Sequence, residues 1–165
     1  MRHHLFYHES QLECSCSCNN KRYKEDGVTP VNTTTQIPLY QQLATFLNNK
    51  DSREQLLYRA KIEETRQLNV YRDVFDGDVY QSHKHLFGNN YDMAIALYID
   101  GFNPTKRGST SMVTFTAVIM NLPPNIRYKK EDMLQVFVTF GEIKPKNLFS
   151  YLLPTFQNLL TLEKH

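Results

Sequence analysis

The chain has 165 residues, of which 41% are apolar and 12% aromatic, enough to bury the core of one modest domain. Its 19 basic and 17 acidic residues give a net charge of +2, so charge alone provides no strong argument for a dedicated nucleic-acid-binding protein. No apolar run reaches the roughly 20 residues that a membrane span requires, and the N-terminus lacks a signal-peptide core. We therefore expect an intracellular protein without a membrane partner.

Residues 1–36 are polar and irregular, and we expect little order in them. The three cysteines of the chain, Cys14, Cys16 and Cys18, lie together in this segment. Their odd number and close spacing argue against a secreted disulfide scaffold.

Residues 37–90 are predicted to be helical. Residues 38–48 carry apolar side chains at the spacing of one helix face, with Pro38 in the first turn. Asp51 and Glu54 predict the N-terminal cap of a second helix, which ends before the polar residues 63–67. A short helix is expected over residues 79–87, ending at Gly88. The buried positions expected in the first two helices are Leu39, Leu43, Phe46, Leu47, Leu56, Leu57, Ala60 and Ile62.

Three runs rich in Val, Ile, Thr, Phe and Tyr follow, at residues 93–99, 112–120 and 134–140, and predict three strands. The short connections between them favour an antiparallel meander. A Leu-rich helix should then begin after Asn147 as its cap, with Pro154 kinking it or marking its start. We expect the aromatic residues of the strands to pack in the core rather than stack on nucleic-acid bases.

Asp100 directly follows the first strand run, where Gly101 allows a turn and Pro104 stops any continuation. A carboxylate at a strand end is a common ligand of a divalent metal ion. The alternative is a turn acid that accepts hydrogen bonds from backbone amides. For Arg127, Lys129 and Lys130, as for residues 21–24, the alternatives are phosphate contact and solvated surface charge.

Several short motifs follow one another along the chain. Those of the second half are Asp100-Gly101-Phe102-Asn103-Pro104, Asn121-Leu122-Pro123-Pro124, Arg127-Tyr128, and Gly141 with Lys144-Pro145 before the Leu-rich helix. Those upstream are Cys18, Lys21-Arg22-Tyr23-Lys24, Pro38-Leu39, Tyr58-Arg59 and Phe75-Asp76-Gly77. Their order and spacing resemble those of the CACTA-type DNA transposases. The resemblance extends from the region before the catalytic domain to the start of that domain.

The resemblance implies an RNase H-like fold, in which a fourth strand pairs beside the first and bears a second metal-binding acid. Asp100 matches the first acid of a site that holds two Mg²⁺ or Mn²⁺ ions in an intact relative. The family's second and third acids lie beyond the Leu-rich helix, where this chain stops. None of the other acids stands at the second acid's place; they are Asp76, Asp78, Asp92, Glu131, Asp132 and Glu142.

This chain departs from the family pattern at three places. Where the family usually has a Gly-Pro-Lys run, this chain has Gly141-Glu142-Ile143-Lys144. Thr105 stands where the family has an aromatic residue after Asn-Pro. Ser15 replaces the partner of Cys18 in a Cys-x-x-Cys pair that can clamp zinc. Cys14 and Cys18 could still bind zinc as a remnant of that finger, with a histidine from His3, His4 or His8 completing the shell.

The sequence thus predicts an α/β (α+β) protein in three regions: an irregular Cys-containing tail at 1–36, a helical lead-in at 37–90, and at 91–165 a truncated RNase H-like unit of three antiparallel strands plus a helix. The expected function is that of a truncated or degenerate CACTA-type transposase without DNA cleavage activity alone. The alternatives are a transposase-derived DNA-binding or assembly module, and a pseudogene product with no selected role. The expected partners are transposon-end DNA in the nucleus and a full-length transposase, with no small-molecule substrate.

Overall fold

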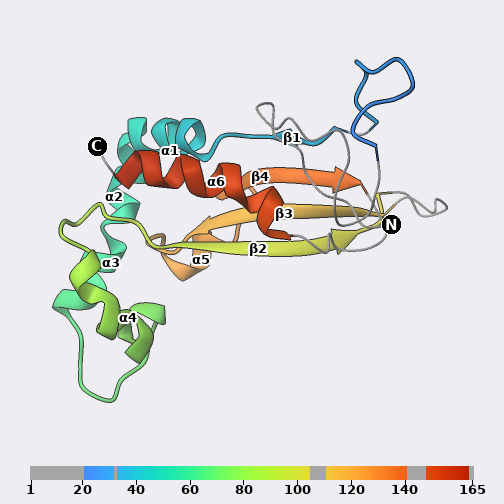
Figure 1. Ribbon diagram of the computed structural model, residues 1–165. Helices are drawn as coiled ribbons and strands as arrows, with labels where there is room; N and C mark the ends of the chain where they lie inside the picture. Colours follow the sequence, from blue (N-terminus) through green and yellow to red (C-terminus); the bar gives the residue numbers. More distant parts are fainter. Residues whose placement is uncertain (1–20, 32, 105–110, 141–147, 164–165) are drawn as a thin grey trace. The chain divides into compact units, whose positions relative to one another are not determined.

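The computed structural model describes residues 21–31, 33–104, 111–140 and 148–163 (Figure 1). It is a mixed α+β protein, and its described helices and strands follow one another as β1 (Thr35–Gln36), α1 (Leu39–Asn48), α2 (Lys50–Leu56), α3 (Tyr58–Glu64), η1 (Val74–Asp76), α4 (Asp78–His83), η2 (Lys84–Leu86), β2 (Ile95–Phe102), β3 (Met112–Ile119), α5 (Pro124–Arg127), β4 (Met133–Phe140) and α6 (Leu148–Glu163). Among the described helices, none combines the length and apolarity needed to cross a bilayer.

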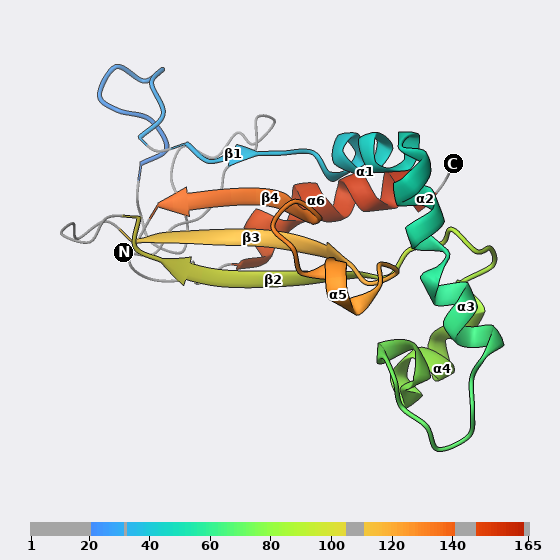
Figure 2. The ribbon, with the colours of Figure 1, turned by 180° about the vertical axis from the view of Figure 1, so that it is seen from behind.

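The strands form a four-stranded antiparallel sheet in the order β1-β4-β3-β2, which can be followed from both sides in Figures 1 and 2. The three predicted strands are present and adjacent, as an antiparallel meander requires. β1 adds a fourth strand, with Thr35 opposite Val138 and Gln36 opposite Phe137. Within the described residues, β2 therefore has a neighbouring strand on one side only.

The prediction of little order before residue 37 is wrong for residues 21–31 and 33–36. Tyr23 and Pro30 form an antiparallel bridge around a turn. In that turn the Asp26 carboxylate accepts hydrogen bonds from the amides of Val28 and Thr29, at 3.0 and 2.8 Å. Gly27 there has φ of +68°, which glycine adopts without steric cost. The strand β1 that follows is only two residues long and depends on its pairing with β4, so no local sequence pattern predicted it.

The helical lead-in is confirmed, with two changes. The second predicted helix is divided at Leu57, where ψ is −3° instead of the roughly −42° of an α-helix. Its cap is Asn49, not Asp51, because the Asn49 side chain accepts a hydrogen bond from the Ser52 amide at 3.1 Å. The short helix predicted at residues 79–87 is present as α4 and η2.

In the second half, one element was not predicted, and one alternative is decided. The connection after β3 contains the one-turn helix α5, which begins at Pro124, where the missing amide hydrogen is tolerated. In the C-terminal helix, Pro154 lies inside α6 rather than at its start. The predicted cap, Asn147, lies outside the described residues.

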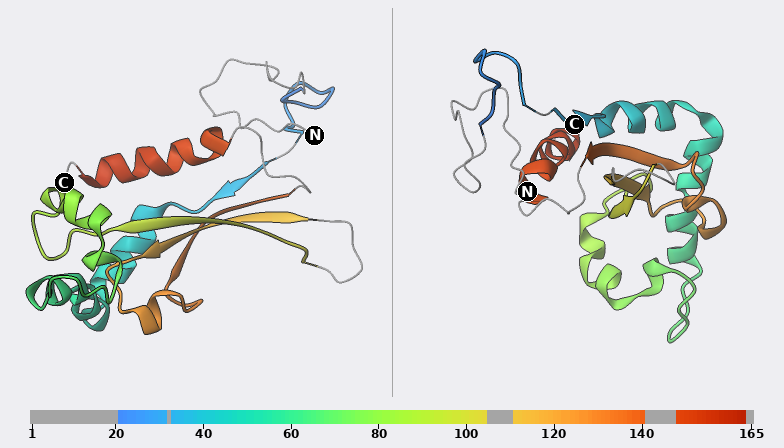
Figure 3. Two further views of the ribbon diagram at one scale, coloured as in Figure 1. Left: turned by 90° about the horizontal axis from the view of Figure 1, so that it is seen from below. Right: turned by 90° about the vertical axis from the view of Figure 1, so that its right-hand side faces the viewer.

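The chain divides into two compact units. Unit 1 comprises residues up to Tyr40, Ile99–Phe115 and residues from Gln135, and unit 2 comprises Gln41–Tyr98 and Thr116–Leu134. In unit 1, α6 runs along the β1 and β4 strands (Figure 3). There the Phe137 ring stacks on Phe115 and Tyr151, with centroids 3.9 and 5.6 Å apart.

The core of unit 2 combines apolar side chains with buried polar ones. Its fully buried apolar side chains include Leu56, Phe75, Ala117, Val118, Ile119 and Leu122. Asn121 is also buried, and its side chain joins two backbone groups that precede β2. It accepts a hydrogen bond from the Ala94 amide and donates one to the Asp92 carbonyl oxygen, both at 2.9 Å. A side-chain amide thereby satisfies backbone groups that the β-ladder leaves without a partner.

Candidate functional site

Asp100 lies on an exposed part of β2. We expected the strand to end just before it and Gly101 to turn the chain, but β2 continues through Asp100 and Gly101 to Phe102. One carboxylate oxygen of Asp100 accepts a hydrogen bond from the Gly101 amide at 2.9 Å. This contact with a backbone amide is the kind expected of the structural alternative.

The predicted metal ligands are not brought together by the described part of the chain. Within residues 21–31, 33–104, 111–140 and 148–163, no three His, Cys, Asp or Glu side chains gather as a metal site would require. Cys14, Cys18, His3, His4 and His8 lie outside these residues. The zinc remnant and the magnesium or manganese ligand at Asp100 therefore stay predictions.

Arg127 is not a surface residue, contrary to both interpretations of its sequence context. Its side chain is 4% exposed, and the Asp73 side chain opposite it is 2% exposed. The guanidinium donates to Asp73 from both terminal nitrogens, at 3.1 to 3.3 Å, and Nε donates to the Leu122 carbonyl oxygen at 2.9 Å. A buried guanidinium occupied in this way cannot contact a DNA phosphate. The sequence could not reveal it, because Asp73 lies 54 positions away.

Tyr58 completes the cluster around Asp73. Its hydroxyl donates a hydrogen bond to Oδ2 of Asp73 at 3.1 Å. Burial, together with the negative charge of Asp73, raises the pKa of Tyr58 to about 12. The guanidinium carbon of Arg127 also lies 5.8 Å from the centre of the Tyr58 ring. Tyr58, Asp73 and Arg127 thus form one interlocked group that joins α3, η1 and α5.

A second buried group surrounds Arg59. Its guanidinium donates to Glu63 at 2.7 Å and to the Asn89 carbonyl oxygen at 2.5 Å, and it lies over the Phe87 ring. Glu63 also accepts hydrogen bonds from the Tyr80 hydroxyl and from Lys84. Burial alone would raise the pKa of Glu63, but these hydrogen bonds outweigh burial and lower it.

Arg72 and Asp76 form another ion pair of unit 2. The Asp76 side chain is 1% exposed and accepts hydrogen bonds from the Arg72 amide at 2.9 Å and from its guanidinium at 3.1 and 3.2 Å. The hydrogen bond from the Arg72 side chain, against the opposing effect of burial, lowers the pKa of Asp76. Three carboxylates of unit 2, on Asp73, Glu63 and Asp76, are therefore committed to structural ion pairs.

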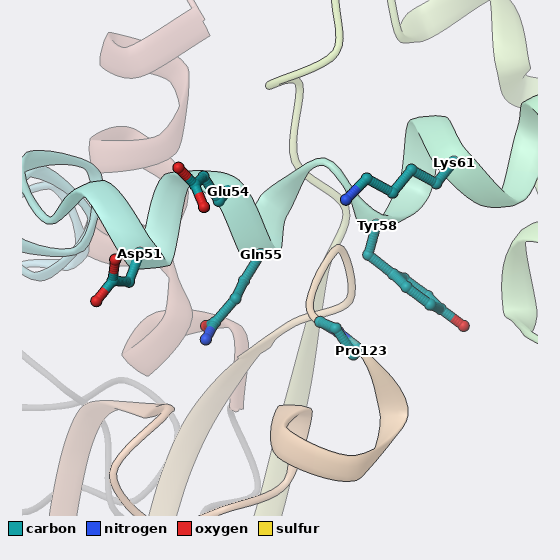
Figure 4. Close-up of a pocket in the computed structure, with 6 residues that line it drawn as sticks. All are labelled: Asp51, Glu54, Gln55, Tyr58, Lys61 and Pro123. Carbon is teal, nitrogen blue, oxygen red and sulfur yellow. The ribbon is translucent and has the colours of Figure 1, made fainter.

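A groove of about 390 Å³ runs along α2 and α3 (Figure 4). Asp51, Glu54 and Gln55 line it from α2, Tyr58 and Lys61 from α3, and Pro123 from the loop before α5. Its walls carry both signs of charge. The ion pair of Glu54 with Lys50, at 4.0 Å, is largely exposed, so it contributes little to stability. The groove supplies polar contacts but no convergent catalytic group.

Lys129 and Lys130 are exposed, as the sequence suggested, and remain candidates for phosphate contact. Beside them lies a feature that contradicts one prediction. The aromatic residues of the strands were expected to pack in the core, but Tyr98 of β2 is 42% exposed. The rings of Tyr98 and Tyr128 meet edge to face with centroids 6.4 Å apart. A usable signal was the position of Tyr128, directly before two lysines, whereas its partner on β2 could be found only from the fold.

Comparisons with protein-family models, with curated proteins and with solved structures find no match.

Proposed function

We propose that this chain derives from a CACTA-type DNA transposase, that its strands β2 to β4 with α6 are the first half of an RNase H-like unit, and that the polypeptide does not cleave DNA by itself. The observation that carries the proposal is the presence of Asp100 on an edge strand. In the RNase H-like fold, the strand of the first acid receives a further strand, with the second acid, at its side. The order β4-β3-β2 agrees with that arrangement, since β2 has a described neighbour only in β3.

The lack of cleavage follows from the number of ligands. Two divalent ions about 4 Å apart repel each other, and several negative ligands must converge to hold them. Asp100 supplies one carboxylate, while Asp73, Glu63 and Asp76 are engaged by arginine side chains. These acids serve the stability of unit 2.

The proposal is tested with the purified chain, terminal-repeat DNA and either Mg²⁺ or Mn²⁺, using nicking as the readout. We expect no strand cleavage by the chain or by its Asp100→Ala variant. Robust cleavage that Asp100→Ala abolishes would overturn the proposal. The transposase origin has its own test, because the genomic DNA downstream should encode a strand-like run ending in Asp and later a helix with an acid.

The second candidate function is a DNA-binding or assembly module, and the exposure of Lys129 and Lys130 favours it. Such a module would retain transposon-end DNA or a full-length transposase in the nucleus. Phosphate contacts make the binding salt-sensitive, because each contact releases counterions from the DNA. The test is retention on DNA at low and high salt and co-purification with a full-length relative. Absence of both at low ionic strength would remove this candidate.

A further inference from the structure

The tyrosine pair of Tyr98 and Tyr128 offers two aromatic rings to solvent. The two residues are 42% and 52% exposed, respectively. Their rings meet at an angle of 88°, the edge-to-face arrangement that aromatic pairs favour. Each ring therefore supports the other while part of its surface stays open. A flat, apolar ligand face could cover that surface without any rearrangement of the core.

Both tyrosines are held by ordered backbone. Tyr98 belongs to β2, and Tyr128 follows α5 directly. After Tyr128 the chain makes tight turns. The backbone amide of Lys129 donates a hydrogen bond to the Ile126 carbonyl oxygen at 2.8 Å, and the backbone amide of Asp132 donates one to the Lys129 carbonyl oxygen at 3.0 Å. The hydrogen bond with the Tyr128 side chain, followed by burial, raises the pKa of Tyr98. The backbone contacts on both sides thus make the pair a preorganised surface.

The charges around the pair are modest. Lys129 and Lys130 follow Tyr128 and are exposed, and Glu131 and Asp132 come next. Burial, and then the charge of Glu131, raises the pKa of Asp132. Arg127 adds no available charge, because Asp73 pairs with it. Two lysines can contact phosphates, but a binding surface of this composition must rely on its rings.

We propose that Tyr98 and Tyr128 stack on unpaired bases of single-stranded DNA while Lys129 and Lys130 contact its phosphates. This inference rests on the DNA-binding function proposed above and specifies its substrate. Aromatic side chains bind single strands because every unpaired base offers a π-face, whereas the bases of a duplex are already stacked on one another. The weak local charge favours the same partner, since duplex binding depends mainly on phosphate contacts.

The test uses fluorescence anisotropy at low ionic strength with a labelled thymidine oligonucleotide of about 12 nucleotides, within the range of known single-strand sites. An abasic oligonucleotide of the same length keeps the phosphates but removes the bases, and a duplex supplies stacked bases. We expect the thymidine strand to bind more tightly than the abasic strand, by roughly 5- to 100-fold in Kd for each base that a ring stacks on.

Substitution of the rings should abolish that preference. We expect Tyr98→Ala and Tyr128→Ala each to lose roughly 5-fold or more in Kd for the thymidine strand and little for the abasic one. Tyr98→Phe and Tyr128→Phe keep the rings and should keep the affinity. The matched control is Tyr91→Ala, because Tyr91 is 45% exposed in the same unit.

Replacing the lysines should change the salt dependence of DNA binding. Replacing both Lys129 and Lys130 by glutamine should make the slope of log Kobs against log salt less steep by about 1.4, since each single-strand phosphate contact contributes about 0.7. Replacing the exposed Lys61 and Arg66 of the same unit is the matched control and should leave the slope unchanged.

The outcomes separate this proposal from the function on which it rests. Equal binding of thymidine, abasic and duplex DNA, unaffected by the tyrosine substitutions, would overturn base stacking and leave DNA binding in place. Failure to retain any of the three DNAs at low ionic strength would overturn the DNA-binding function and this proposal together. A preference for the thymidine strand that only the tyrosine-to-alanine variants lose would support both.

Discussion

The two compact units are stabilised by different interactions. In unit 1, Phe137 is stacked between Phe115 and Tyr151. In unit 2, three ion pairs have at least one buried partner, those of Arg59, Arg72 and Arg127. Apolar packing depends on side-chain shape and volume, whereas a buried ion pair depends on the presence of both partners and on the charge of the acid. Substitutions and acid should therefore affect the two units differently.

The largest effect is expected where volume is removed from unit 1. Phe137 is 2% exposed, and Phe137→Ala would leave a cavity between two rings. We expect the free energy of unfolding to fall by about 4 kcal/mol, measured by urea denaturation. Phe149→Ala is the matched control, because Phe149 is 63% exposed and its loss should change stability little. Equal effects of the two substitutions would contradict the aromatic core.

A loss of about 3 kcal/mol is expected from Arg127→Met, because it leaves the carboxylate of Asp73 buried without its cation. Replacing both partners, as Arg127→Met with Asp73→Leu, should recover much of the loss, since no unpaired charge remains. Urea denaturation of the single and double variants measures this coupling. Lys130→Met makes the same change at an exposed residue and should be nearly neutral. A double variant less stable than the single one would contradict the pairing.

Acid should weaken unit 2 through Glu63 and Asp76. Both have a pKa in the folded protein below the ordinary values of 4.5 and 3.8, so their stabilising contributions are present above those values and are lost as the pH falls through the folded pKa. The thermal midpoint of unfolding, measured from pH 7 downward, should begin to decrease once the pH is below about 4.5. Glu63→Gln should make that decrease smaller. The exposed neighbour provides the control, Glu64→Gln, which should retain the full decline.

The smallest effect tests the start of α2. Asn49→Ala removes the side-chain acceptor of the Ser52 amide and should lower the free energy of unfolding by about 1 kcal/mol. Asp51→Ala removes the residue that the sequence pattern indicated as the cap and should have a smaller effect. Urea denaturation of both variants decides between them. A larger loss in Asp51→Ala would favour the cap that the sequence predicted.

The predictions from local sequence patterns are confirmed for helices and strands whose own residue spacing or composition is distinctive. Helix α1 follows from the spacing of its apolar residues. Leu39 and Leu43 are buried as expected, whereas Phe46 and Leu47 are only half-buried. Strands β2 to β4 and helix α6 follow from composition and length. The end of β2 was misjudged at Asp100, because a glycine permits a turn but does not impose one, and the ladder with β3 extends past it.

The sequence by itself determined helices α1, α2 and α6 and strands β2 to β4, because periodicity and turn residues act over a few positions. It also carried the motif order on which the proposed transposase origin rests. Only the tertiary structure decided that β1 joins the sheet, that Arg127 is buried beside Asp73 while Lys129 and Lys130 stay exposed, and that Tyr98 meets Tyr128. Such contacts join residues far apart in the chain, and charge or aromatic character alone does not say which partner lies opposite.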